Sequence, residues 1–535
     1  MWNQLRQLLK HSAIYGLGNL AISLLSFLLV PLYTHYLSVT EFGVYSLIII
    51  VYSLMSLVVD LGLSSSVARY YFDDAKERNP EDLSRFRRRL LSTAFGVTAV
   101  SSAALAVAGY MAAGWVARSL FGSSDFEVHL RIIAITLLCY GLGTAPMIYL
   151  RITERSLAYS VITCCQVSLF LAFNIIFLVK LSAGVVGIFY SLLASTAVYA
   201  LMGIAAIARD LRAEFDARLT GQLFKFGLPF LPVMLLKWVI DFSDRYLLDH
   251  YASISAVGVY SLGYKFGQGM AFVVTAFTLG WVPIRFKMLS LADPRVVYGR
   301  VATLYIAVAG FIWLALSVFS HEIIMLTAPA AFRQAAVFIP PVALSYLLYG
   351  LFVLSVTGAG VAKRTAGLPL VMLAAAVLNI GLNLVLIPRV GAMGAAFSTL
   401  AAYSAMVAAG LYVSERVYPI AYQYRQCAIL MGGMIVLAAP ATVLPEGTPI
   451  VTIPVKLVVL AAYGGVVAIS GALTRSEWNR VAGILSAYAP GFLKGRMAAG
   501  RHHSRVTTDE TRAAGETQVA RETPAGTANA EVSRI

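Results

Sequence analysis

Long apolar stretches run through most of this chain and constrain its fold more than any other feature. About 20 consecutive apolar residues cross the hydrocarbon core of a bilayer as a helix. Of the 535 residues, 59% are hydrophobic and only 13% are charged, whereas globular proteins carry about 25% charged residues. The sequence therefore predicts an all-α polytopic membrane protein with about 14 transmembrane helices, and it excludes a soluble enzyme or a coiled coil. The predicted spans are 13–37, 42–70, 90–114, 130–150, 159–180, 184–207, 227–249, 256–284, 301–319, 335–361, 367–388, 393–413, 427–444 and 450–472.

The distribution of Lys and Arg predicts the orientation of these spans, because cytoplasmic loops collect basic residues. With fourteen spans and the N-terminus inside, 31 of the 41 Lys and Arg residues fall on the inner side and six on the outer side. We therefore expect a multi-pass membrane protein with both termini in the cytoplasm. The net charge of +15 is then loop charge, and no basic soluble domain points to nucleic acid.

The sequence contains an internal duplication. Residues 35–47 align without gaps on residues 250–262, with eight of thirteen positions identical. A second match relates spans 5 and 6 to spans 11 and 12. The first copy contains Asn174 and Lys180, followed by Gly184-x-x-Gly187. The second copy contains Asn383 and Arg389, followed by Gly391-x-x-Gly394. Both matches shift the chain by six spans. An even shift preserves orientation, so two six-helix lobes related by a pseudo-two-fold axis along the membrane normal are expected, as in transporters built from parallel repeats.

The duplication predicts the domain organisation. We expect an N-terminal lobe over 1–207, a cytoplasmic linker over 208–226 and a C-terminal lobe over 227–413. Two additional helices lie within 427–472, outside the duplication, and residues 473–535 are expected to form a disordered cytoplasmic tail because residues 501–535 have almost no large apolar side chains.

Ionisable residues within the spans cluster in the helices that the duplication relates. Such groups are costly inside a membrane and usually face a partner or a cavity. In span 7, Lys237, Asp241 and Arg245 share one helical face by their i, i+4 spacing. The remaining members are Asp60, Arg69, Asp244 and Lys265.

Two interpretations of this cluster remain open. In the first, the charges of span 7 neutralise one another and only join helices. In the second, Lys237, Arg245 and Lys265, with Arg69 as a further candidate, form a cationic cavity that binds an anionic headgroup. Arg suits phosphate through its bidentate geometry and Lys acts as a point charge. Asp60, Asp241 and Asp244 would then tune the site or bind a coupling cation.

Motifs for enzymatic chemistry are missing from the sequence. The segment 358–365 resembles a phosphate-binding loop only superficially, because Ala362 stands where a glycine should precede the lysine. No metal-binding helix or serine elbow occurs, and the outer loops are short. We therefore expect a transporter and not an enzyme, without a cofactor or a metal.

The first two spans resemble the oligosaccharide flippases of the multidrug/oligosaccharidyl-lipid/polysaccharide exporter superfamily, the Wzx-type polysaccharide transporters. The resemblance rests on Pro31-Leu-Tyr-Thr, Phe42-Gly-Val-Tyr-Ser-Leu, Asp60-Leu-Gly-Leu and Arg69-Tyr-Tyr, together with the fourteen spans and the duplication. It implies that the protein moves undecaprenyl-pyrophosphate-linked oligosaccharide repeat units to the periplasmic leaflet by alternating access coupled to an ion gradient. By position it favours Arg69 and Lys237, then Arg245 and Lys265, as phosphate contacts. Polysaccharide polymerase and glycosyltransferases are the implied partners, besides membrane lipids.

Alternatives remain at this stage. Peptidoglycan-precursor flippases resemble the chain in span count but tend to have a cationic first helix, which is not found between Lys10 and Arg69. Cation-coupled small-molecule exporters usually have twelve spans and acidic cavities. A membrane glycan polymerase or ligase is the alternative from another functional class.

Overall fold

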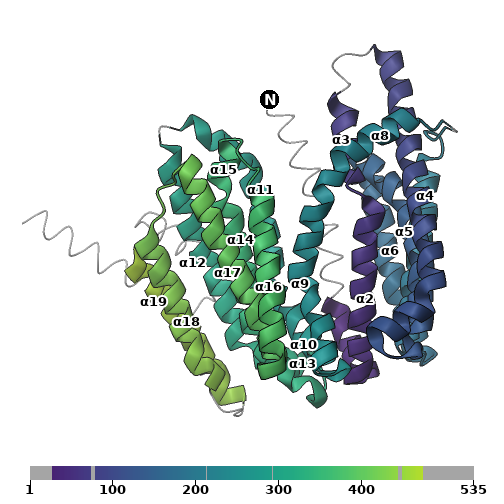
Figure 1. Ribbon diagram of the computed structural model, residues 1–535. Coiled ribbons are helices and arrows are strands. Elements are labelled where there is room, and N and C mark those ends of the chain that lie inside the picture. The colour runs from purple at the N-terminus through teal and green to yellow at the C-terminus, as the bar shows by residue number, and fades with distance from the viewer. Residues whose placement is uncertain (1–26, 74–78, 213, 292, 444–448, 474–535) are drawn as a thin grey trace, which may run out of the picture. The chain divides into compact units, whose positions relative to one another are not determined.

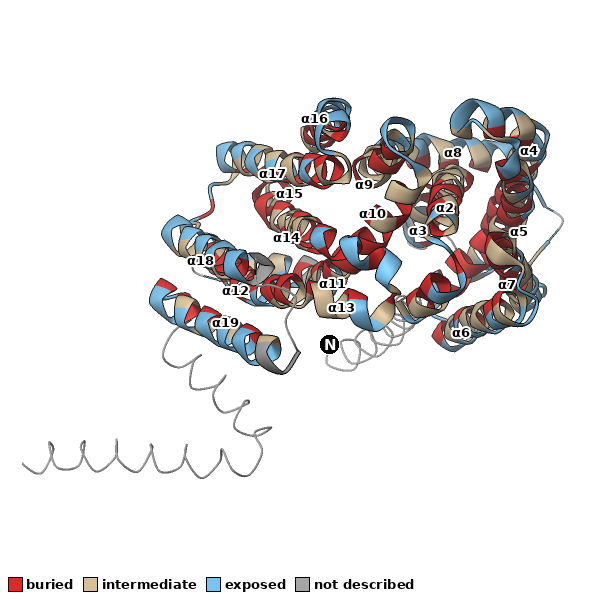
Figure 2. Cartoon of the chain, turned by 90° about the horizontal axis from the view of Figure 1, so that it is seen from below, coloured by how far each residue is buried: buried red, intermediate tan, exposed pale blue. Residues whose placement is uncertain are grey.

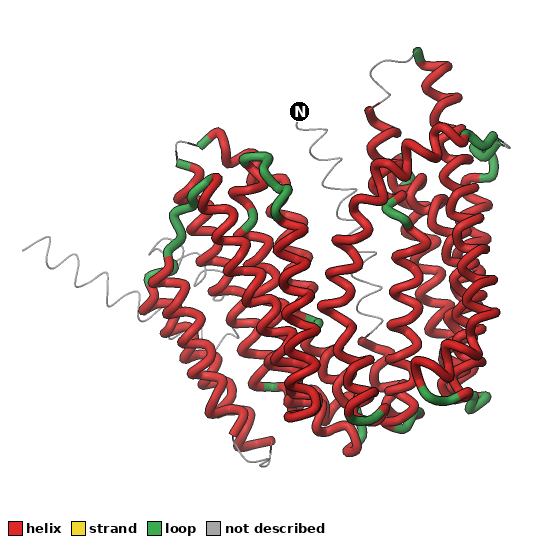
Figure 3. The backbone as a smooth tube through the Cα atoms, viewed as in Figure 1, coloured by secondary structure: helices red, strands yellow, loops and turns green. Residues whose placement is uncertain are grey.

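The computed structural model describes residues 27–73, 79–212, 214–291, 293–443 and 449–473, and within them it holds helices and no strand (Figure 1). The prediction of an all-α chain is confirmed. Loops gather at the two ends of the helices (Figure 3), as expected where helices cross a bilayer. Among the described residues, twelve helical segments are long and apolar enough to span a membrane, and Tyr424–Pro440 is a shorter apolar helix.

Each predicted span has a helical counterpart, although the bounds differ. The first predicted span is described only from residue 27 and is helical over 27–36; its earlier part, like residues 474–535 of the predicted tail, lies outside the described residues. The helices of the first half are α2 (Val39–Asp60), α3 (Leu63–Asp73), α4 (Pro80–Phe121), α5 (Glu127–Ile152), α6 (Ser156–Asn174), the π-helix η3 (Ile175–Lys180), α7 (Gly184–Ile207) and α8 (Ala217–Gly227).

The second half repeats this pattern and adds helices. Its elements are α9 (Leu231–Tyr251), α10 (Ile254–Gly267), α11 (Met270–Lys287), α12 (Pro294–Val318), α13 (Ser320–Thr327), the 3-10 helix η6 (Ala330–Phe338), α14 (Ile339–Ser355), α15 (Thr357–Val361), α16 (Leu368–Val390), α17 (Ala392–Val417), α18 (Tyr424–Val443) and α19 (Pro449–Ser470). Lys456 of α19 forms a buried ion pair with Glu322 of α13, which ties this last helix to the others.

The predicted linker 208–226 contains a helix, α8. The Asp216 carboxylate caps it by accepting a hydrogen bond from the backbone N–H of Leu219 at 3.0 Å. Leu219 and Leu223 are buried on one face, and Ser66 of α3 donates a hydrogen bond to the Leu223 carbonyl at 2.8 Å. Because α8 is short and amphipathic, its apolar residues lie on one face only and form no continuous apolar stretch. The prediction of membrane spans from such stretches therefore did not include it.

The duplicated segments contact each other reciprocally. Ser38 caps α2 and the aligned Ser253 caps α10, each accepting a hydrogen bond from a backbone N–H three residues on. A Cβ atom at Gly43 would lie 2.1 Å from the carbonyl oxygen of Ile254, and one at the aligned Gly258 would lie 2.1 Å from that of Val39. Val39 and Ile254 are themselves aligned. Such an exchange of equivalent contacts is what a two-fold axis between α2 and α10 produces.

The second duplicated motif also forms equivalent structures. Gly184 and Gly391 both have positive φ, at 56° and 60°, and each stands at the start of a long helix, α7 or α17. The second glycine of each motif packs against the helix before it. Gly187 contacts Phe177, and Gly394 contacts Leu386, which is the residue aligned with Phe177. Both sequence matches therefore correspond to structural equivalence.

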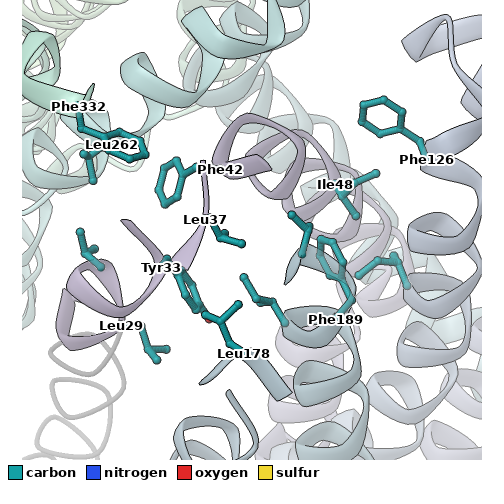
Figure 4. Packing of buried hydrophobic residues seen from close by; sticks show 14 of the residues in the cluster. Leu29, Tyr33, Leu37, Phe42, Ile48, Phe126, Leu178, Phe189, Leu262 and Phe332 are labelled. Atoms are coloured by element: carbon teal, nitrogen blue, oxygen red, sulfur yellow. The ribbon is translucent and has the colours of Figure 1, made fainter. Parts of the chain in front are cut away.

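Packing between helices follows the rules of a membrane protein. Figure 2 shows buried residues on faces turned toward neighbouring helices and exposed residues on outward faces. Many of the exposed side chains are large and apolar, such as Met111, Trp115 and Leu201, which suits contact with lipid. A core cluster that includes Phe42, Phe189 and Phe332 joins α2, α7 and η6 (Figure 4), with the rings of Phe42 and Phe332 edge to face at 5.7 Å.

Candidate functional site

The charged face of α9 forms two ion pairs. Lys237 Nζ pairs with Asp241 Oδ2 one turn on, and Arg245 Nη1 contacts Asp244 Oδ1 at 3.0 Å. Arg245 also donates a hydrogen bond to the backbone carbonyl of Asp241. Asp241, Asp244 and Arg245 are all buried. The two acids and two bases balance in charge, so this cluster alone is neutral.

Tyrosines from three other helices complete the cluster. Tyr403 of α17 donates a hydrogen bond to Asp241 Oδ1 at 2.6 Å, and Tyr260 of α10 donates one to Asp244 Oδ2 at 2.5 Å. The Arg245 guanidinium lies 3.9 Å from the ring centroid of Tyr264, and Lys237 Nζ lies 4.7 Å from that of Tyr349. Hydrogen bonds and cation–π contacts therefore offset the cost of burying Asp241, Asp244 and Arg245 and of partly burying Lys237.

Three adjoining cavities lie beside α2 and α9. The first, which we name the Lys237 cavity, has about 600 Å³ and is bordered by Lys237, Asp241, Tyr349 and Ser53 among others. The second, the Lys265 cavity, has about 170 Å³. The third, the Asp60 cavity, has about 360 Å³. The Lys237 cavity shares Phe242 with the Lys265 cavity, and it shares three wall residues with the Asp60 cavity, namely Ser56, Leu57 and Met234.

Lys265 and Arg245 both line the Lys265 cavity. The ammonium group of Lys265 has no hydrogen-bond or ion-pair partner among the described residues. Ser261 Oγ, which also lines this cavity, is buried and has no hydrogen-bond partner in the described part of the chain. These groups are donors that an anion in the cavity would satisfy.

Three charged positions of this site are apolar in the first repeat. When the gap-free alignment of residues 35–47 with 250–262 is extended in both directions, Asp244, Arg245 and Lys265 correspond to the buried residues Leu29, Val30 and Ile50. The two copies have therefore diverged in chemistry while they kept the same packing glycines.

Asp60 and Arg69 lie apart from the charged face of α9. Asp60 ends α2, borders the Asp60 cavity and accepts a hydrogen bond from Ser64 at 2.7 Å. Arg69 is exposed on α3, with its guanidinium 4.4 Å from the ring centroid of Phe226, and it borders none of the three cavities. The structure thus gathers Lys237, Asp241, Asp244, Arg245 and Lys265, whereas Arg69 does not join them.

Sequence reasoning missed the tyrosines of this site. Tyr260 and Tyr264 are spaced i, i+4 before Lys265, and this spacing was a usable signal. Tyr349 and Tyr403 could not be selected from 28 tyrosines without knowledge of the helix contacts. In the part of the chain that the structure describes, no group of three or more His, Cys, Asp or Glu side chains could hold a metal ion.

Comparison with known proteins identifies the family. A model of the polysaccharide biosynthesis protein family matches residues 8–289, more than half of the chain. The chain belongs to this family. No curated protein is similar enough in sequence to count as a relative.

Solved structures share the fold of this family member. The lipid II flippase MurJ in an inward closed conformation superposes with a TM-score of 0.66 at 13% identity, covering 85% of this chain and 98% of MurJ. An inward-facing multidrug resistance MATE family transporter of the MOP superfamily gives a TM-score of 0.60 at 13% identity, covering 78% and 99%. A mutant of the Vibrio cholerae MATE transporter VcmN gives 0.53 at 17% identity, covering 77% and 96%. The protein is therefore a multi-pass membrane protein with the fold of these transporters.

Proposed function

We propose that this protein is a flippase that moves undecaprenyl-pyrophosphate-linked oligosaccharide repeat units across the bacterial inner membrane, with both termini in the cytoplasm. The family and the fold support a role in polysaccharide biosynthesis by transport and not by catalysis. The observation that carries the proposal is a pair of lysines at adjoining cavities. Lys237 is held by the Asp241 carboxylate, and Lys265 has no partner among the described residues.

The geometry suggests how substrate binding is coupled to an ion. The diphosphate of the substrate and the Asp241 carboxylate compete for the same ammonium group of Lys237. A proton or another cation that neutralises Asp241 frees Lys237 for the diphosphate, and departure of the cation restores the ion pair and weakens phosphate binding. Exchange between these two pairings, together with rocking of the lobes, gives alternating access with a defined direction.

Export of small cations is less consistent with this arrangement. A cationic substrate in the Lys237 cavity needs an unpaired carboxylate there, yet Asp241 is paired with Lys237, and the neighbouring Asp244 is paired with Arg245. Lys265 adds a further positive charge at the neighbouring cavity. An anionic headgroup therefore fits the site better than a cation does.

The experiment is reconstitution into liposomes that hold the undecaprenyl-diphosphate oligosaccharide in both leaflets. The proposal predicts that sugars of the inner leaflet become accessible to a membrane-impermeant lectin only when the protein is present. Liposomes with a Lys180→Met variant, altered at an exposed lysine outside the cavities, should behave like those with the unmodified protein. Transport of ethidium without movement of the lipid would contradict the proposal.

A further inference from the structure

The Asp60 cavity has no role in the exchange described above, yet it is lined by polar groups from five helices, α2, α3, α5, α6 and α7. Asp60 comes from α2, Tyr140 and Arg151 from α5, and Tyr199 from α7. Its volume of about 360 Å³ lies within the range of about 300–1,000 Å³ typical of small-molecule sites.

Several of these polar groups lack partners among the described residues. Ser64 occupies one oxygen of the Asp60 carboxylate, and the other has no hydrogen bond. The Arg151 guanidinium and the Tyr199 hydroxyl also make no hydrogen bond or ion pair with the part of the chain that the structure describes. The cavity thus offers an acceptor and several donors that remain available to a ligand.

Packing fixes the aromatic rings of this cavity. Gly143 of α5 leaves room for Tyr199, because a Cβ atom at this glycine would lie 2.4 Å from Cε1 of the ring. The Tyr140 ring is held edge to face against Tyr52, with 6.1 Å between the ring centroids. Rings held in place by packing bind a ligand at low cost in conformational entropy.

The chemistry of the cavity matches a carbohydrate. A carboxylate accepts hydrogen bonds from neighbouring sugar hydroxyls, a guanidinium and a phenol donate them, and aromatic rings cover the apolar C–H faces of a sugar. One acid and one base leave the cavity without net charge, unlike the Lys265 cavity. A neutral polar ligand is therefore favoured over a second phosphate.

We propose that Asp60, Arg151 and Tyr199 form a carbohydrate subsite that binds the sugars next to the diphosphate of the lipid-linked oligosaccharide. The inference rests on the proposed function for the identity of the whole substrate. Ser56 and Leu57 line both cavities, so sugars that extend from a diphosphate at Lys237 along this shared wall enter the subsite. The inference gives Asp60 a role in recognition that differs from the ion coupling expected from the sequence.

The test measures equilibrium binding by the purified full-length protein to three probes. These are undecaprenyl diphosphate, the undecaprenyl-diphosphate oligosaccharide extracted from cells that lack this gene, and the free oligosaccharide released from that lipid by mild acid. The variants are Asp60→Asn and Tyr199→Phe, and the matched control is Asp125→Asn at an exposed carboxylate outside the cavities. Circular dichroism and size-exclusion chromatography establish that each variant is folded.

Asp60→Asn is expected to raise the Kd for the lipid-linked oligosaccharide about tenfold, since the negative charge that strengthens the hydrogen bonds from sugar hydroxyls is lost and one acceptor oxygen becomes an NH2 donor. The Kd for sugar-free undecaprenyl diphosphate should not change, and Tyr199→Phe should act in the same direction with a smaller effect. Two results would overturn the subsite. One is an equal rise of the Kd for both lipids, which ion coupling through Asp60 would give. The other is an unchanged Kd for the lipid-linked oligosaccharide. If the unmodified protein binds the free oligosaccharide through Asp60 but neither lipid, the proposed function fails and the subsite stands.

Discussion

Replacing Lys237 with methionine separates the structural role of this lysine from its proposed role in binding. Methionine keeps most of the apolar volume but removes the ammonium group that pairs with Asp241. The Asp241 side chain is 11% exposed and keeps its hydrogen bond from Tyr403. Breaking a buried ion pair costs about 3–5 kcal/mol, and the retained hydrogen bond places Lys237→Met at the lower end, about 3 kcal/mol of folding stability.

The effect on binding has a separate magnitude. A hydrogen bond between charged groups contributes about 1.5–3 kcal/mol, so loss of the ammonium group should raise the Kd for undecaprenyl diphosphate about 10- to 100-fold. The double variant Lys237→Met/Asp241→Asn no longer buries an unpaired carboxylate. It should therefore regain stability while its affinity stays low.

The assay combines thermal unfolding with binding of undecaprenyl diphosphate, using Lys180→Met as the control for loss of an exposed lysine. The reasoning predicts that stability recovers in the double variant and affinity does not. If Lys237→Met binds the lipid with unchanged affinity, or if affinity returns together with stability, Lys237 only joins helices.

Two further predictions address coupling and the duplication. Asp241→Asn alone should bind undecaprenyl diphosphate more tightly, because Lys237 loses its competing carboxylate. The same variant should translocate this lipid more slowly. Weaker binding in an equilibrium assay would argue against competition for Lys237. Gly43→Ala should sharply reduce the yield of folded protein, because its Cβ would lie 2.1 Å from the Ile254 carbonyl oxygen, whereas Gly381→Ala, with no atom within 4 Å of its Cβ, should be tolerated. Equal yields of these two variants in detergent-solubilised membranes would show that α2 and α10 do not cross at this glycine.

The apolar stretches and the duplication carried most of the information about the fold. Membrane spans can be predicted from sequence because the bilayer demands long apolar helices. The repeat predicted a pseudo-two-fold relation, with which the equivalent contacts of Gly43 with Ile254 and of Gly258 with Val39 agree. The short helix α8 was not predicted, because its apolar residues cover one face only and it is shorter than a membrane span.

The candidate site was predictable where spacing within one helix determined it. Lys237, Asp241 and Arg245 share a face of α9 by the geometry of any α-helix. The partners that keep Asp241 and Asp244 buried come from distant parts of the chain, Tyr403 from α17 and Tyr260 from α10. Sequence spacing holds no information about such contacts. For the same reason Arg69, which shares a predicted span with Asp60, could not be separated from the cavities before the structure showed it beside Phe226.

The measurement that tests the central claim most directly is a leaflet-resolved assay in cells that lack this gene. It asks on which side of the inner membrane the undecaprenyl-linked oligosaccharide accumulates. The account predicts accumulation on the cytoplasmic side, relieved by the intact gene and not by one that encodes Lys237→Met. Accumulation on the periplasmic side would mean that translocation proceeds without this protein, and would instead favour a polymerase or ligase that acts after it.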